Sequence, residues 1–177
     1  MEPLYTKRLK LRNVEEDDIH TIVEYRNHEV TIKYQRNQIR DMEGIKQLIQ
    51  DSKEDSLSME KTSYLSIAFK TTNEMIGEIM VMPNKQDQCI SLGYTLSHAY
   101  HRQGYGFEAL SVLIDYLHEK YPSYSFVSFA DPNNIASIHL LKKLGYHYLG
   151  YSSKLVSEVF GKWLSDDIDV FRSKKED

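Results

Sequence analysis

Hydrophobic residues recur with two different periods along the first fifty residues. Residues 9–14 alternate apolar and polar side chains, which is typical of a strand with one buried face. Residues 15–28 open with acidic side chains, which suit the positive end of a helix dipole, and continue with apolar positions at helical spacing. Residues 41–51 repeat that spacing behind Asp41, a candidate N-cap. The chain therefore opens with a strand and two helices.

Three strands are predicted next, after an aperiodic polar stretch that we interpret as a surface loop. Residues 64–70 and 74–83 flank a polar turn and have the pattern of a hairpin. The third strand is residues 89–96. Its large side chains share one face: Ile90, Leu92, Tyr94 and Leu96. Its small side chains share the other: Cys89, Ser91, Gly93 and Thr95. The small face leaves room for another group to lie against it.

A helix pattern begins near residue 107 and ends near Pro122, and residues 125–130 read as a short strand. A strand, a helix and a second strand in this order predict a parallel pair with a right-handed crossover. The loop before the helix then lies at the carboxyl end of a strand, where open sheets usually bind ligands.

The last predicted helix has clear start and stop signals. Asn133 or Asn134 can cap it, and Gly145 fits the left-handed position that ends it. Residues 146–156 and 166–173 are predicted as the closing strands. This order of elements predicts an α/β protein whose residues 1–177 form a single domain, with a mixed sheet flanked by helices on both faces.

Composition excludes several classes of function. The 177 residues carry a formal net charge of −4 with both signs interspersed, so no basic field for nucleic acid is expected. A single cysteine, Cys89, forms neither an internal disulfide nor a multi-thiolate metal site, and it points to the reducing cytoplasm. No apolar run reaches the length of a signal peptide core or a membrane span, and the histidines show no metal-ligand spacing. We therefore expect neither a membrane partner nor a bound metal.

Two glycines stand where the predicted strand–loop–helix unit turns into its helix. Gly104 and Gly106 would let a ligand approach the unpaired N–H groups of the helix N-terminus, and Arg102 can add a full charge. This arrangement is a candidate cradle for a phosphate or a pyrophosphate. Alternatively, the two glycines only form the turn that leads into the helix. Neither a nucleotide P-loop motif nor G-x-G-x-x-G is present.

The stretches LGYTLSHAYHRQGYGFEAL and DPNNIASIHLLKKLGY together resemble the GCN5-related N-acetyltransferases, and most closely the group that acetylates ribosomal-protein N-termini. In that family R/Q-x-x-G-x-G/A binds the acetyl-CoA pyrophosphate, and N-x-x-S/A lines the pantetheine arm. Residues 104–106 match the first motif, and Asn134 with Ser137 match the second. The closing G-K-W-x-D stretch matches Gly161, Lys162, Trp163 and Asp166 or Asp167. The resemblance covers nearly the full chain and is strongest over residues 88–147.

The resemblance implies a mostly antiparallel, twisted sheet of the acyl-CoA N-acyltransferase fold. It implies direct transfer of an acetyl group from acetyl-CoA to a primary amine in a ternary complex, by a monomer or homodimer. The expected acetyl-CoA-binding residues are Tyr94, Thr95, Leu96, His101, Arg102, Gln103, Gly104, Tyr105, Gly106, Phe107, Asn134 and Ser137.

Two positions depart from the family pattern. His101 stands where relatives usually have Arg or Gln, and we expect Arg102 or Gln103 to compensate. Leu141 stands where many relatives have a tyrosine that acts as general acid. The ribosomal-protein group also lacks that tyrosine and keeps a serine at the position of Ser137.

The chemistry requires a neutral amine, a polarised thioester carbonyl and a proton for the leaving thiolate. By resemblance, the backbone N–H of Leu96 or of the residue before it polarises the carbonyl, and Ser137 serves the thiolate. Glu78, in an otherwise apolar strand, is the first candidate for the base, although alternation could point it to solvent or to an arginine. Weaker candidates for the base are Asp87, His98 and Tyr100.

The acceptor is open at this stage. Tyr25, Arg26, Tyr34 and Tyr64 could line its side of the site, although tyrosines at such positions also serve as packing residues. A protein N-terminus, a polyamine and a small amine such as an aminoglycoside all fit. A module that senses acyl-CoA without turnover is the alternative function. A nucleotide-binding protein is less favoured, because no Mg²⁺-binding motif accompanies the glycines.

Overall fold

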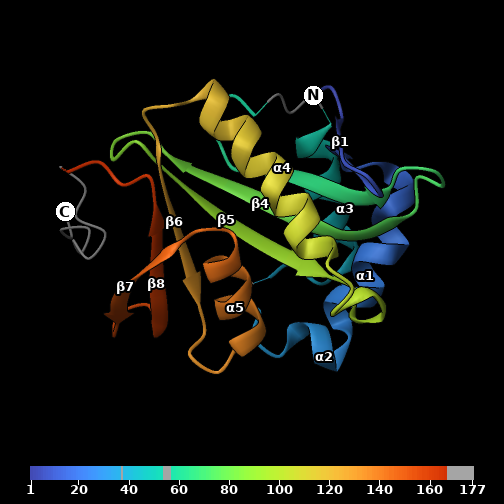
Figure 1. Cartoon of the computed structure of the whole chain (residues 1–177). Coiled ribbons are helices and arrows are strands. Elements are labelled where there is room, and N and C mark those ends of the chain that lie inside the picture. Colours follow the sequence, from blue (N-terminus) through green and yellow to red (C-terminus); the bar gives the residue numbers. More distant parts are fainter. Residues whose placement is uncertain (37, 54–56, 167–177) are drawn as a thin grey trace.

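The computed structural model describes residues 1–36, 38–53 and 57–166. They form one eight-stranded sheet in the order β1-β2-β3-β4-β5-β6-β8-β7 (Figure 1). The strands are β1 (Leu4–Tyr5), β2 (Leu9–Asn13), β3 (Ser63–Phe69), β4 (Met75–Asn84), β5 (Cys89–Leu96), β6 (Ser125–Ala130), β7 (His147–Ser152) and β8 (Ser157–Lys162). The helices are α1 (Ile19–Asn27), α2 (Glu29–Ile32), α3 (Met42–Ser52), α4 (Tyr105–Lys120) and α5 (Ile135–Lys143), with 3₁₀ turns η1 (Glu16–Asp18) and η2 (His98–Tyr100).

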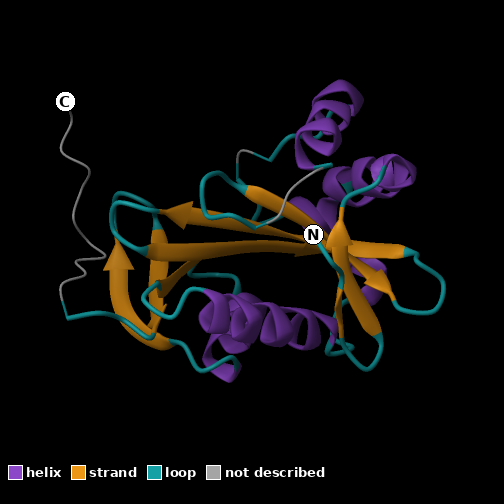
Figure 2. Ribbon diagram, turned by 90° about the horizontal axis from the view of Figure 1, so that it is seen from above, coloured by secondary structure: helices purple, strands orange, loops and turns teal. Residues whose placement is uncertain are grey.

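Helices cover both faces of this sheet (Figure 2). Helix α4 lies across β4 and β5 on the same face as α5 (Figure 1), and its apolar stripe packs into a core with Ile90 and Leu92 of β5. A second core lies between α1 and α3, where Ile22 packs with Ile45 and Ile49. The predicted fold class, a mixed and mostly antiparallel sheet between helical layers, is confirmed.

Neighbouring strands are antiparallel except for β5 and β6, which are parallel. Their register contains only two residue pairs, Cys89 with Ser125 and Ile90 with Phe126. Beyond these pairs β5 keeps β4 as its partner through Leu96, but β6 no longer accompanies it. The sheet therefore splays open along the carboxyl half of β5. The predicted parallel pair is confirmed.

One row of residues that runs across four strands is polar and buried. Arg12 of β2 lies opposite Ser66 of β3, Ser66 opposite Glu78 of β4, and Glu78 opposite Thr95 of β5. All four are at most 5% exposed. Because directly paired residues share a face, the row lies on one face of the sheet, under α1. Buried polar groups usually have internal partners, and three of these four residues do. Arg12 pairs with Asp18 of η1 at 2.7 Å, Glu78 with Arg26 of α1, and Thr95 with Gln38, whereas Ser66 Oγ has no hydrogen-bond partner within the described residues.

The expected helix ends are confirmed. The side chain of Asp41 accepts a hydrogen bond from the Gly44 N–H at 2.8 Å, and Asn134 caps α5 by accepting from the Ser137 N–H at 3.2 Å. Gly145 has φ +84°, the left-handed conformation that ends a helix at low cost only in glycine.

The closing strands differ from the prediction. The stretch 146–156 contains only β7, and residues 153–156 form a turn that leads into an unpredicted strand, β8. Leu155 and Val156 suggested a continuing strand, but both are about half exposed, and Val156 has φ +49° in the turn. Apolar residues in a turn therefore hid the hairpin. The predicted strand 166–173 lies outside the described residues except for Asp166.

Candidate functional site

The turn before α4 is built around Gly104. This residue has φ +82° and occupies the N-cap position, so no side chain stands in front of the first amides of the helix. A side chain would be strained at that φ, because Cβ clashes with the backbone in the left-handed region. The open amides and the positive end of the helix dipole together favour an anion in front of this turn.

Gly106 has a different role from Gly104. It is buried in the first turn of α4, and a Cβ there would lie 3.3 Å from Leu140 Cδ2 and 3.4 Å from Leu96 Cδ1. Helix α4 therefore approaches α5 and the end of β5 closely because this position lacks a side chain. Of the two glycines, Gly104 opens the helix terminus and Gly106 lets three elements meet beside it.

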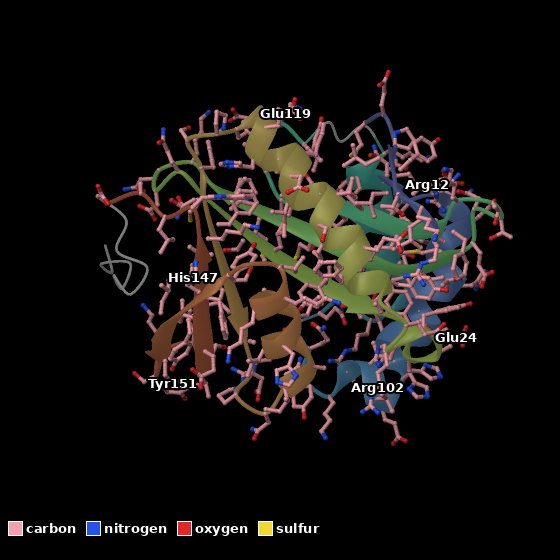
Figure 3. All side chains as sticks on the ribbon, viewed as in Figure 1. Arg12, Glu24, Arg102, Glu119, His147 and Tyr151 are labelled. Atoms are coloured by element: carbon pink, nitrogen blue, oxygen red, sulfur yellow. The ribbon has the colours of Figure 1, made fainter. Side chains whose placement is uncertain are left out.

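The three residues before Gly104 are arranged differently from one another. His101 Nε2 is hydrogen-bonded to the Leu96 carbonyl oxygen at 2.9 Å, and Gln103 Nε2 donates to the Ala99 carbonyl at 3.0 Å. Both side chains therefore fold back onto the loop. Arg102 is exposed with φ +59°, beyond the N-terminal end of α4, while Glu119 marks the opposite end (Figure 3). Of these side chains, only that of Arg102 is free to turn toward an anion.

A second arginine, which the sequence did not single out, lies beside the turn. Arg8 Nε donates to Glu108 Oε2 at 2.7 Å, and Arg8 Nη1 donates to the Gln103 carbonyl at 3.1 Å. Its guanidinium stacks 4.2 Å from the centre of the Tyr105 ring. Burial raises the pKa of Glu108, but hydrogen bonds from Thr6 and Arg8 outweigh it and lower that pKa overall. Arg8 thus offsets the charge of a carboxylate that would otherwise repel an anion.

The open edge of β5 presents backbone groups of alternate residues. The Ser125 N–H donates to the Gln88 carbonyl on the β6 side, whereas the Ser97 N–H donates to the Ile76 carbonyl on the β4 side. Because successive residues in a strand point to opposite neighbours, the N–H and C=O groups of Leu92, Tyr94 and Leu96 face the splay. The backbone of Thr95 faces β4 instead.

Residues 33–36 and 38–41, between α2 and α3, form what we call the crossing segment, because its side chains reach both sides of this opening. Gln35 Nε2 donates to the Tyr94 carbonyl at 3.2 Å. Arg36 pairs with Asp131 at 2.6 Å, just beyond the end of β6, and also donates to the Leu155 carbonyl at 3.0 Å. The segment thereby bridges both strands of the splay.

Tyr94 and Ser137 meet on the α4 and α5 face of the sheet. The Tyr94 hydroxyl lies 2.6 Å from Ser137 Oγ, and Asn134 fixes the Ser137 backbone as the cap of α5. Burial raises the pKa of the Tyr94 phenol above its ordinary value, although the hydrogen bond with Ser137 offsets part of the rise. A residue of β5 is thus joined to the predicted motif at the start of α5 by a direct side-chain contact.

Glu78 lies on the opposite face, in the polar row. Arg26 of α1 holds it with two hydrogen bonds, Nε to Oε1 at 2.8 Å and Nη2 to Oε2 at 2.6 Å. Gln38 Nε2 donates to Glu78 Oε1 at 3.0 Å and to Thr95 Oγ1 at 3.1 Å. Of the alternatives considered from sequence, the arginine partner is the one observed.

The weaker candidates for the base are spread over the molecule. Asp87 bonds to Asn84 in the β4–β5 turn, at the opposite end of β5 from Gly104, and Tyr100 donates to Glu74 at 2.7 Å. The His98 ring stacks on His28 with 3.5 Å between ring centres, at the junction of α1 and α2. Its buried Nδ1 has no hydrogen-bond partner within the described residues. Of these three candidates, His98 is therefore the one with a nitrogen that has no such partner in the part of the chain that the structure describes.

The proposed acceptor wall is more buried than the sequence suggested. Tyr25 and Arg26 are each 1% exposed, and Tyr64 packs against the same core. Burial raises the pKa of Tyr25 well above its ordinary value, and the nearby Glu78 carboxylate adds to the rise. Tyr34 lies in the crossing segment, with the Lys33 ammonium 5.2 Å from its ring centre. Tyr34 is therefore the better placed of the four for contact with a ligand.

Among residues 1–36, 38–53 and 57–166, no three His, Cys, Asp or Glu side chains lie close enough to hold a metal ion. No helix in the same residues is long and apolar enough to cross a membrane.

The diverging parallel pair and the open helix terminus together define an α/β fold with an anion-favouring helix terminus near the carboxyl end of a strand, where such folds usually bind ligands. Comparison with known proteins narrows this class. Residues 8–147 match the sequence model of the acetyltransferase (GNAT) domain. The uncharacterized N-acetyltransferase p20 of Bacillus licheniformis is 31% identical over 159 residues, which cover 85% of each chain.

Solved structures share the fold. The ribosomal-protein-S5-alanine acetyltransferase from Vibrio fischeri has a TM-score of 0.76 at 19% identity, covering 93% of this chain and 97% of that one. The Microcin C7 self immunity acetyltransferase MccE, in complex with acetyl-CoA and AMP, also has a TM-score of 0.76, at 17% identity and with 89% and 93% coverage. The chain belongs to the GNAT acetyltransferase family. The predicted class, an acetyl-CoA-dependent acetyltransferase, is confirmed.

Proposed function

We propose that this protein transfers the acetyl group of acetyl-CoA to a primary amine by direct attack in a ternary complex. The observation that carries the proposal is the divergence of β6 from β5 directly beside the Gly104 turn. That divergence leaves an edge for the pantetheine amides next to a helix terminus for the diphosphate. MccE, which shares the fold, was solved with acetyl-CoA, and this supports the same donor here.

Each part of the donor has matching residues. The amides of residues 104–107 receive the diphosphate, and Arg8 and Arg102 add charge beside them. The Leu96 N–H polarises the thioester carbonyl, because Leu96 faces the splay and Thr95 does not. Asn134 and Ser137 lie against the pantetheine arm on the α5 side. The remaining proposed donor contacts are Tyr94, Thr95, His101, Gln103, Tyr105, Gly106 and Phe107.

The amine must lose a proton before it attacks. The hydrogen bonds that Glu78 makes affect whether it can take that proton, and therefore which amine can be used. Glu78 stays a predicted base, but Arg26 and Gln38 already bond to both of its oxygen atoms, which favours a role in holding α1 and the crossing segment in place. A lysine-like amine, with a pKa of about 10.4, is almost entirely protonated at neutral pH, whereas an α-amine has a pKa near 8. This supports a weakly basic acceptor such as a protein N-terminus over a polyamine or another strongly basic small amine.

Release of CoA thiol tests the proposal, measured with acetyl-CoA and separate panels of N-terminal peptides, polyamines and aminoglycosides. We expect release that depends on the amine and is fastest with an α-amine. Gly104→Asp should raise the KM for acetyl-CoA at least about tenfold, because its carboxylate would face the diphosphate. Gly104→Ala imposes the same backbone strain without the charge, and is the matched control.

An acyl-CoA sensor without turnover is the competing function. It would bind CoA in calorimetry, weakened in Gly104→Asp, but release no thiol with any amine. We further propose a cytoplasmic enzyme that acts as a monomer or homodimer, on the basis of its single cysteine, Cys89, and of the family resemblance. Light scattering during gel filtration tests the assembly state.

A further inference from the structure

A short contact joins a hydroxyl group of β5 to one of α5, beside the proposed donor site. Tyr94 reaches Ser137 across 43 residues of sequence, with 2.6 Å between the oxygen atoms. Tyr94 stands on the strand that opens toward the donor, and Ser137 stands in the first turn of α5. Each is partly buried, so the bond is shielded from bulk water. The contact therefore links the strand and the helix that flank the proposed thioester position.

The chemistry of the two groups decides which one donates. A phenol, with a pKa of about 10, is far more acidic than an aliphatic hydroxyl and is the better donor, while the serine oxygen is the better acceptor. With Tyr94 as donor, the Ser137 proton is left free to point away from the tyrosine. The Ser137 N–H donates to Asn134 Oδ1, which fixes the backbone from which Oγ projects. Rotation about the serine Cα–Cβ bond is then constrained from both sides.

The adjacent turn of α5 explains why the hydroxyl comes from β5. Leu141 lies four residues after Ser137, on the same face of the helix, and is 2% exposed. It therefore offers an apolar wall and no proton donor at the position where many relatives carry a tyrosine. In the described part of this face, Tyr94 supplies the phenol that contacts Ser137.

We infer that Tyr94 is a positioning residue that aims the Ser137 hydroxyl at the sulfur of the departing CoA. This inference rests on the proposed function. The amine nitrogen bonds to the acetyl carbon, and the C–S electron pair moves to sulfur. Sulfur takes the Ser137 proton, Ser137 recovers one from Tyr94, and Tyr94 recovers the proton that the new amide nitrogen releases to water. The products are an amide and CoA thiol.

The test compares Tyr94→Phe, Ser137→Ala and the double variant, with Tyr121→Phe as the matched control. Tyr121 packs against the same core, and its hydroxyl donates to the Leu57 carbonyl at 2.7 Å, at the C-terminal end of α4 and so at the opposite end of that helix from Gly104. Its change therefore also removes one hydrogen-bonded phenol hydroxyl. We expect each single variant to lower kcat by about 10- to 100-fold, with the KM for acetyl-CoA changed less than about threefold. The double variant should be no slower than the slower single variant, because both changes remove one relay.

Ser137→Thr separates positioning from packing. It keeps a hydroxyl, so it should retain most of the activity when Tyr94 is present and lose it in the Tyr94→Phe background. If the wild-type enzyme acetylates amines, two results would overturn the inference: effects of the two single changes that multiply in the double variant, or a Tyr94→Phe variant as active as Tyr121→Phe. A wild type that binds CoA but releases no thiol with any amine would overturn the proposed function, and this inference with it.

Discussion

The two faces of the splayed sheet are built on different physical principles. On the α4 and α5 face, the proposed donor site consists of backbone amides, an open strand edge and the Tyr94–Ser137 hydroxyl pair. We call this the donor face. On the α1 face, Glu78 of the polar row forms a buried ion pair with Arg26, and Gln38 links Glu78 to Thr95. The donor face is an open set of hydrogen-bonding groups that would suit a cofactor, whereas the charges of the α1 face already have partners and hold α1 against the sheet.

The largest effect is expected from breaking the ion pair. Glu78→Gln keeps the shape of the side chain but leaves the Arg26 guanidinium buried without a countercharge. We expect a loss of about 3–5 kcal/mol in the free energy of unfolding, measured by urea denaturation. Asp131→Asn is the control, because its partner Arg36 is about half exposed and the pair should contribute less than about 1 kcal/mol. A Glu78→Gln protein as stable as Asp131→Asn would remove the contrast between the faces.

A smaller loss of stability is expected on the donor face from Gly104→Ala. At φ +82° an L side chain costs about 1–2 kcal/mol, and thermal unfolding should measure this loss. Gly106→Ala should be the milder change, because its methyl group would meet only the side-chain ends of Leu140 and Leu96, at 3.3 and 3.4 Å, and because alanine favours a helix more than glycine does. Equal losses from the two variants would mean that the left-handed turn is not what requires a glycine at position 104.

The Glu108 carboxylate gives a pH-dependent signature. Its pKa is lowered in the folded protein, so its contribution to stability is fully present above the unfolded value of about 4.3 and is lost as pH falls through the folded value. Glu108→Gln should therefore destabilise the protein at pH 7, and its difference from wild type should shrink below about pH 4. Urea midpoints measured between pH 7 and pH 3 check this. A difference that stays constant with pH would show that the carboxylate charge is not the source.

The smallest effect is expected from the crossing segment. Gln35→Ala frees the Tyr94 carbonyl for a donor amide, and one net hydrogen bond is worth about 1 kcal/mol. The KM for acetyl-CoA should therefore fall by a few fold, with little change in kcat. An increase in KM would instead show that Gln35 helps to hold the donor.

The donor site was predictable from sequence because its signals are local. A glycine at a helix start, an N-cap asparagine and an alternating strand each act within a few residues, and they placed the Gly104 turn, Asn134 and the large-residue face of β5 correctly. The order of elements also gave the sheet and its one parallel pair. Periodicity gave no warning of the β7–β8 hairpin, because exposed Leu155 and Val156 lie in its turn.

The α1 face was less predictable because its contacts join residues far apart in the chain. Arg26 and Glu78 are 52 residues apart. Arg8 and Glu108, beside the Gly104 turn, are 100 residues apart and were missed for the same reason. No spacing rule links such partners. The sequence indicated that a buried Glu78 carboxylate would need a partner, because an unpaired buried charge is unfavourable. Which arginine is that partner followed only from the packing of α1 on the sheet. The tyrosines Tyr25 and Tyr64 likewise proved to be core residues.

Only two residue pairs join β5 to β6, so the sheet consists of two parts, β1 to β5 and the smaller wing, β6 to β8, with few hydrogen bonds between them. A chain of amides laid along the free edge of β5 would act as a missing strand and close the gap. Loading the thioester should therefore stiffen the whole molecule, and amides of the smaller wing should exchange more slowly with deuterium. Bound acetyl-CoA would then be a structural part of the sheet until its acetyl group is transferred.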